Sequence, residues 1–140
     1  MRACSVTRPA NTVGDVFYDI LPLADGRLMV AVGDVVGKGR PAALLMALLL
    51  AMLRTLVDEG LESVRPISRL NVQICRHSQG PRFITFFFGV YNPADSSLEY
   101  VNAGHLPPMV RRASGAIERL DRGGVALFMQ MRESAPRSFV

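Results

Sequence analysis

An apolar run over residues 42–53 is the feature that most constrains how this chain can fold. Arg54 ends it, short of the roughly 18–20 residues that a membrane-spanning helix needs, so we expect no membrane span. Pro41 stands where the first turn of a helix accepts proline, and Gly60 follows the run. The pattern predicts a helix over 40–58 that is apolar nearly all round and buried on more than one side.

Two strand-like segments, 16–23 and 27–35, precede this helix and flank the dipeptide Asp25-Gly26. Asp-Gly between two apolar runs is a strong signal for a hairpin. Further along, the period of the apolar residues predicts a second helix over 66–77 and then two more hairpins, with strands over 82–91, 98–102, 109–112 and 116–120. Runs of strands and helices that do not alternate strictly imply an α+β fold with an antiparallel sheet.

Several carboxylates bracket the first hairpin. If its turn has two residues, cross-strand partners sum to 51, so Phe17 lies opposite Asp34 and shares its face with Asp15 and Asp19. Acidic groups gathered at the end of a hairpin would repel one another without a cation, and a divalent metal with oxygen ligands is one solution. The alternative is that these aspartates are solvated strand ends.

The charge and cysteine content of the chain limit the classes of protein to which it can belong. The chain has 140 residues, enough for one domain (1–140), with 16 basic and 12 acidic residues. Its arginines are scattered, with no basic stripe, so we expect no nucleic-acid partner; a nonspecific nucleic-acid binder would show steeply salt-dependent affinity. Cys4 and Cys75 form no CxxC pair, and the first residues contain no apolar signal segment. The default location is therefore a reducing cytoplasm.

Two loops carry candidate site residues. The segment GDVVGKG contains Gly33, Gly37, Lys38 and Gly39, and its glycines permit close approach of backbone to an ion or phosphate. Its spacing is not that of a P-loop and gives little support to nucleotide binding; the alternative is a plain strand-to-helix connection with Lys38 in solvent. His105 lies in AGHLPP, a rigid loop; a lone loop histidine is more often structural than catalytic.

These motifs together resemble the SpoIIE-like branch of the PPM metal-dependent protein phosphatases. The resemblance covers roughly residues 8–127 and is carried by GDVVGKG followed by PAALLMA, by VNAGHLPP downstream, and by a distal Gly-Gly. It implies an α-β-β-α sandwich of antiparallel sheets flanked by helices. It also implies hydrolysis of phosphoserine or phosphothreonine with two Mn²⁺ or Mg²⁺ ions. By position, Asp34 would be the catalytic metal ligand, the carbonyl of Val35 would hold the second ion, and the helix from residue 40 would be regulatory.

The sequence departs from the family pattern at both ends. The family opens with VGGDxYD, whereas residues 13–19 read VGDVFYD, so the ligand aspartate falls at Val16 and Asp15 stands one residue early. After Gly-Gly the family continues with a YTDG-like motif and a final aspartate, whereas residues 125–140 form an atypical tail without aspartate. We therefore expect an incomplete phosphatase domain that binds one ion or none, with Asp15 as a substitute ligand.

The resemblance also implies partners. Substrates in this branch are often small phosphorylated anti-anti-sigma proteins of the STAS type, in bacterial partner-switching circuits. We expect this chain to act on such a phosphoprotein with weakened or lost activity. The alternative is a catalytically inactive module that binds a STAS-type partner. An apolar sheet left uncovered by missing strands would favour self-association.

Overall fold

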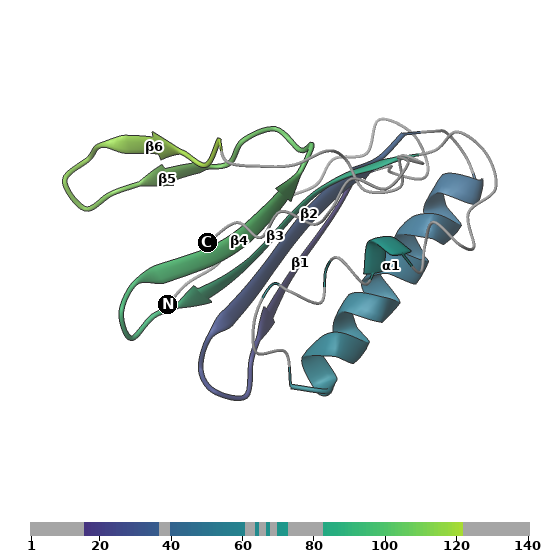
Figure 1. Cartoon of the computed structure of the whole chain (residues 1–140), viewed down its shortest axis with the longest axis horizontal. Coiled ribbons are helices and arrows are strands. Elements are labelled where there is room, and N and C mark those ends of the chain that lie inside the picture. The colour runs from purple at the N-terminus through teal and green to yellow at the C-terminus, as the bar shows by residue number, and fades with distance from the viewer. Residues whose placement is uncertain are drawn as a thin grey trace.

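The computed structural model describes residues 16–36, 40–60, 64, 67, 70–72 and 83–121. The order along the chain is β1 (Val16–Pro22), β2 (Leu28–Val35), α1 (Arg40–Asp58), β3 (Ile84–Asn92), β4 (Ser97–Ala103), β5 (Met109–Arg111) and β6 (Ile117–Arg119). Strands β1 to β4 form an antiparallel sheet in chain order, and β5 pairs with β6 in a second antiparallel sheet. Figure 1 shows α1 lying along one face of the four-stranded sheet.

This architecture confirms the α+β class and the antiparallel hairpins that the sequence predicts. The full α-β-β-α sandwich stays a prediction. Of the second predicted helix, residues 67 and 70–72 are described and are helical. The predicted tail at 125–140 lies outside the described residues.

The first hairpin forms around Asp25-Gly26, but its register differs by one from the prediction. Gly26 has a φ of 85°, and its N–H donates to the Leu23 carbonyl at 3.0 Å. The Leu23 N–H in turn donates to the Arg27 carbonyl at 2.9 Å, so the loop has three residues and ends in a left-handed glycine. The extra loop residue makes cross-strand partners sum to 50: Val16 pairs with Asp34, not Phe17.

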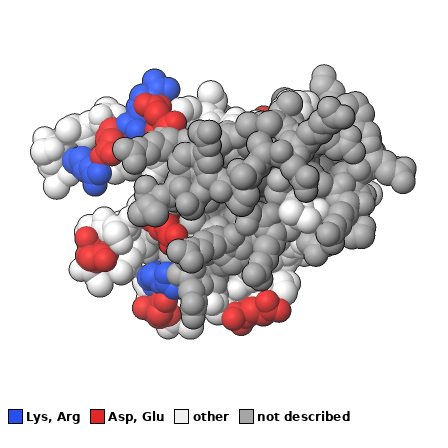
Figure 2. Space-filling model, viewed as in Figure 1, with Lys and Arg blue, Asp and Glu red and all other residues white. Residues whose placement is uncertain are grey.

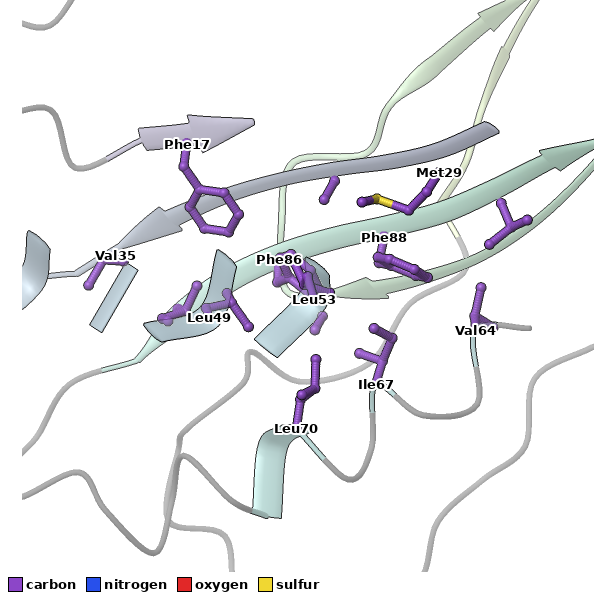
Figure 3. Close-up of a cluster of buried hydrophobic side chains, with 14 of the residues drawn as sticks. Phe17, Met29, Val35, Leu49, Leu53, Val64, Ile67, Leu70, Phe86 and Phe88 are labelled. Atoms are coloured by element: carbon purple, nitrogen blue, oxygen red, sulfur yellow. The ribbon is translucent and has the colours of Figure 1, made fainter. Parts of the chain in front are cut away.

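The core lies between the sheet and α1 (Figure 3). Side chains alternate along each strand, so every second residue of β1, β2 and β3 points at the helix. The rings of Phe17 and Phe86 stack at 5.9 Å between centroids, and those of Phe86 and Phe88 at 6.2 Å. Leu49 and Leu53 of α1 pack into the same buried cluster. Burial of such a side chain stabilises the fold by about 1.5–3 kcal/mol.

Helix α1 buries one face only. Ala42, Leu49 and Leu53 are buried, whereas Leu44 is 71% and Leu48 43% exposed. The prediction of a helix shielded on more than one side is therefore wrong for its described side chains. Rotation by 100° per residue puts Leu44, Ala47, Leu48 and Ala51 together, and all four are exposed. We call these four residues the outer face of α1.

Charged side chains of both signs are interspersed on the visible surface. Figure 2 shows Lys or Arg beside Asp or Glu at the β5–β6 hairpin and at the β1–β2 turn. Arg112 bonds to Glu118 across the β5–β6 hairpin, and Arg27 pairs with Asp25 at 2.7 Å in the turn. The described residues therefore offer no uniformly basic face in this view. Within the same ranges, no helix is long and apolar enough to cross a membrane.

Candidate functional site

Asp34 lies on the sheet face that points away from α1, near the carboxyl end of β2. Its cross-strand neighbours on that face are Val16 of β1 and Thr85 of β3. The residues on either side of it in the chain, Gly33 and Val35, are buried toward the helix, and Asp34 itself is half-buried. The alternation of the strand thus separates one carboxylate from the core and presents it between two neighbouring strands.

His105 reaches the same end of the sheet from the loop after β4. A parallel bridge between Gly104 and Phe86 holds this loop beside β3. The backbone N–H of His105 donates to Asn102 Oδ1 at 2.9 Å, and Asn102 is buried. Gly104 has a φ of 69°, a left-handed conformation that a residue with a Cβ adopts only with strain. The loop is therefore fixed by a side-chain bond and by a glycine turn.

Thr85 joins this loop to the strand that carries it. Its Oγ1 lies 2.9 Å from His105 Nδ1. Burial lowers the pKa of the His105 imidazole, and the negative charge of Asp34 opposes that shift. The site on this face thus consists of Asp34, Thr85, His105 and the buried Asn102, which we call the Asp34 cluster.

Asp19 does not belong to this cluster, contrary to the predicted register. It lies on the helix-facing side of β1, and Arg54 of α1 donates to its Oδ2 at 3.0 Å. Phe17 likewise points into the core rather than toward Asp34. Because the hairpin is shifted by one residue, the two aspartates lie on opposite faces of the sheet.

Gly33 is required by packing rather than by an ion or a phosphate. A Cβ at this position would lie 2.3 Å from Cε1 of Phe17 and 3.2 Å from Cδ2 of Phe86. The first glycine of GDVVGKG therefore leaves room for two core rings. The Val35 side chain is also buried in the core, and a role for its backbone carbonyl as a metal ligand stays a prediction.

Other predicted site residues are not placed. Asp15, Gly37, Lys38 and Gly39 lie outside the described residues. Thr85 and Asn102 are members of the cluster that the sequence did not predict. Once strands β2 and β3 are paired, Thr85 follows as the neighbour of Asp34, but that pairing joins residues about fifty positions apart, which no local pattern predicts.

The described residues fit a two-ion metal centre poorly. They contain no group of three or more His, Cys, Asp or Glu side chains that could hold an ion. Asp34 is the one carboxylate of the cluster, and a valine lies opposite it where a second carboxylate could stand. Two divalent ions need more than one carboxylate between them, even where water completes their coordination.

Comparisons with known proteins identify a matching family and several similar proteins. Residues 24–138 match the family model described as Stage II sporulation protein E (SpoIIE). Protein IcfG of Synechocystis is 29% identical over 89% of this chain and 24% of its own length. Phosphoserine phosphatase RsbU of Bacillus subtilis is 28% identical over 74% of this chain and 30% of its own length.

A solved structure is also similar. The crystal structure of the RsbU and RsbW domains of Rv1364c from Mycobacterium tuberculosis superposes with a TM-score of 0.73 and 28% identity, over 87% of this chain and 34% of that one. The chain thus spans about a quarter to a third of the length of these relatives.

Proposed function

Because the chain belongs to the SpoIIE family, whose model it matches over residues 24–138, we propose that it is a protein phosphatase domain acting on phosphoserine or phosphothreonine. The observation that carries the proposal is the position of Asp34. This carboxylate is the residue that the GDVVGKG motif predicts as a metal ligand, and it lies apart from the core beside the AGH loop. Two motifs that are about seventy residues apart in the chain thus meet on one face of the sheet.

The register of the first hairpin bears on how active the domain is. The family's opening aspartate falls at Val16, and Val16 is the cross-strand partner of Asp34. An aspartate there would stand beside Asp34 on the same face, about 4.5–5.5 Å away between Cβ atoms, a spacing that suits two ligands of one ion. Here the partner is a valine, so we infer that Mn²⁺ or Mg²⁺ binds weakly and that turnover is slow or absent.

The proposal includes the nature of the partner and the location. RsbU is by name a phosphoserine phosphatase, and the solved relative joins an RsbU domain to an RsbW domain. These relatives support a phosphorylated regulatory protein as substrate, and we propose one of the STAS type. We also propose that the chain works in the cytoplasm. Asp15 as a helper ligand, the two-sheet sandwich and self-association through an uncovered sheet belong to the same proposal.

A second function is favoured by one observation. The outer face of α1 is apolar and exposed, although these residues lie in a helix whose opposite side is fully packed. An exposed apolar helix face is typical of a protein-binding surface. A module that binds a STAS-type partner without hydrolysing its phosphate would keep this face and dispense with the metal ligands.

One experiment separates the two functions. Phosphate release from a phosphoserine-bearing STAS protein is measured with excess Mn²⁺, for the parent chain, Asp34→Asn and Leu44→Asp. A phosphatase loses release in Asp34→Asn. A binding module shows no release in any variant, but its affinity for the STAS protein falls in Leu44→Asp and not in Asp34→Asn. Release that is unchanged in Asp34→Asn would contradict the phosphatase proposal.

A further inference from the structure

We propose that the Thr85–His105 pair is a phosphate-binding arm of the Asp34 cluster, in which Thr85 holds the imidazole so that its Nε2–H can donate to a phosphoryl oxygen. This inference rests on the proposed phosphatase function for its substrate. It adds two residues with assigned roles: His105 contacts the phosphoryl group, and Thr85 is a positioning residue that acts through His105.

The first step concerns which ring nitrogen carries the proton. Within the described ranges, the Thr85 hydroxyl has His105 Nδ1 as its hydrogen-bond partner, at 2.9 Å. A half-buried hydroxyl needs an acceptor, and Nδ1 provides one if it is unprotonated. In the proposal, the Thr85 hydroxyl has the donor role in this bond, which places the ring hydrogen on Nε2, the nitrogen that points away from Thr85.

The second step concerns where the ring is held. Its backbone N–H is bonded to Asn102, its loop is bridged to β3, and its Nδ1 is bonded to Thr85. Three separate attachments therefore restrict the imidazole. Thr85 is the direct cross-strand neighbour of Asp34, so the ring is positioned at the carboxylate that the proposed function requires.

The third step concerns what such a group can recognise. A fixed N–H donor that needs no charge of its own suits an anionic oxygen, and donors that are already in place are most effective where charge develops in a reaction. Asp34 alone would repel an anion, so a phosphoryl group can approach only when that charge is neutralised. His105 would thus donate a hydrogen bond to the phosphoryl group, which can approach only once the negative charge of Asp34 has been neutralised.

Nuclear magnetic resonance tests the tautomer directly. The chain has only two histidines, so imidazole ¹H–¹⁵N correlations of the labelled protein are simple to assign, with His77→Asn identifying the second ring. We expect the Nε2–H form at His105 in the parent and in Thr85→Ser, which keeps the hydroxyl, and a mixture of forms in Thr85→Val. Thr55→Val makes the same chemical change on the exposed side of α1 and should leave the His105 signals unchanged. A Nδ1–H form in the parent would overturn the proposal.

Phosphate binding tests the second part of the proposal, that the His105 Nε2–H donates to a phosphoryl oxygen. Inorganic phosphate is titrated into the parent with Mg²⁺, and into Asp34→Asn without metal, because that variant lacks the repelling charge. We expect the His105 Nε2 signal to shift in both titrations. If phosphate shifts it in neither, the proposal is wrong. Neither result depends on hydrolysis, so failure of the phosphatase proposal is recognised separately, as absent phosphate release from a phosphoserine protein.

If the chain does hydrolyse phosphoserine, activity provides a third readout. His105→Ala should lower kcat about 10-fold to 100-fold, in the range found for loss of one fixed donor or slightly below it. His105→Gln places an amide N–H near the position of Nε2 and should recover part of that loss. Equal kcat in the parent and His105→Ala would overturn the proposal.

Discussion

The two faces of the four-stranded sheet are made by the same strands but carry different kinds of side chains. The face toward α1 is filled by stacked rings and aliphatic side chains, with Phe17, Phe86 and Leu49 all buried. The opposite face carries the Asp34 cluster and a buried Phe87 whose ring stacks on Tyr100, whereas Val16 and Tyr18 in β1 are 42% and 38% exposed. The comparison teaches that the face toward α1 is occupied mainly by packed side chains, whereas the opposite face combines packed rings with the polar side chains of the site.

The difference also explains why neighbouring motif residues have unlike roles. In GDVVGKG, Gly33 serves the core and Asp34 serves the site, because a strand sends successive side chains to opposite faces. In VFYD, Phe17 and Asp19 both serve the helix side. A motif that reads as one unit in the sequence is therefore divided between stability and function in the fold.

The largest expected effect comes from a charge placed on the packed side. Leu49→Asp buries an unpaired carboxylate in the core and should destabilise the chain by about 4 kcal/mol or more, enough to unfold a marginally stable domain. Leu44→Asp makes the same change on the outer face of α1 and should shift stability by about 0.5 kcal/mol or less. Urea denaturation followed by circular dichroism measures both. Equal losses would show that α1 does not have one packed and one exposed face.

A smaller effect is expected from adding a methyl group to either side of the sheet. Gly33→Ala places a Cβ against the Phe17 ring and should cost about 1–3 kcal/mol. Gly89→Ala, on the face of Asp34, meets the flexible end of Leu98 at 3.1 Å and should cost less. Phe17→Leu should recover part of the Gly33→Ala loss in a double-mutant cycle. An additive cycle would mean that the ring contact is not the cause.

The ion pair between β1 and α1 should contribute least. Arg54 is largely exposed, whereas the Asp19 side chain is 12% exposed. We therefore expect Asp19→Asn to lower the free energy of unfolding by up to about 1 kcal/mol, and Arg54→Gln by a similar amount, with the double variant no worse than either. Neither change should alter Mn²⁺ binding, because both groups lie on the helix side. A loss of Mn²⁺ binding in Asp19→Asn would break the division between the two faces.

Most features that depend on residues close together in the chain could be predicted from the sequence, whereas features that depend on residues far apart in the chain could not. The hairpin around Asp25-Gly26 followed from local turn chemistry, but its register did not, because a single left-handed Gly26 decides between a two-residue and a three-residue loop. That one residue moved Asp19 to the wrong face in the prediction. The exposed side of α1 was also missed, since an all-apolar run contains no periodic signal of its own.

The candidate site followed the same rule. Asp34 was predicted from its motif, and the backbone of Val35 stays the second proposed ligand. Thr85 was not predicted, since its place beside Asp34 depends on the pairing of β2 with β3 across the whole helical segment. His105 was singled out from its loop, but the partner that positions it became visible only in the fold.

The central claim is that metal affinity is decided on the Asp34 face, at the pair formed by Asp34 and residue 16. Calorimetric titration with Mn²⁺ tests it on the parent, Asp34→Asn and Val16→Asp, with Tyr18→Asp as a control that adds a carboxylate to the same face opposite Val32 instead. We predict weak binding of one ion by the parent, loss of it in Asp34→Asn, and affinity at least about tenfold higher in Val16→Asp, or roughly 1.4 kcal/mol, but not in Tyr18→Asp. Tight binding of two ions by the parent, or binding that survives in Asp34→Asn, would contradict the account.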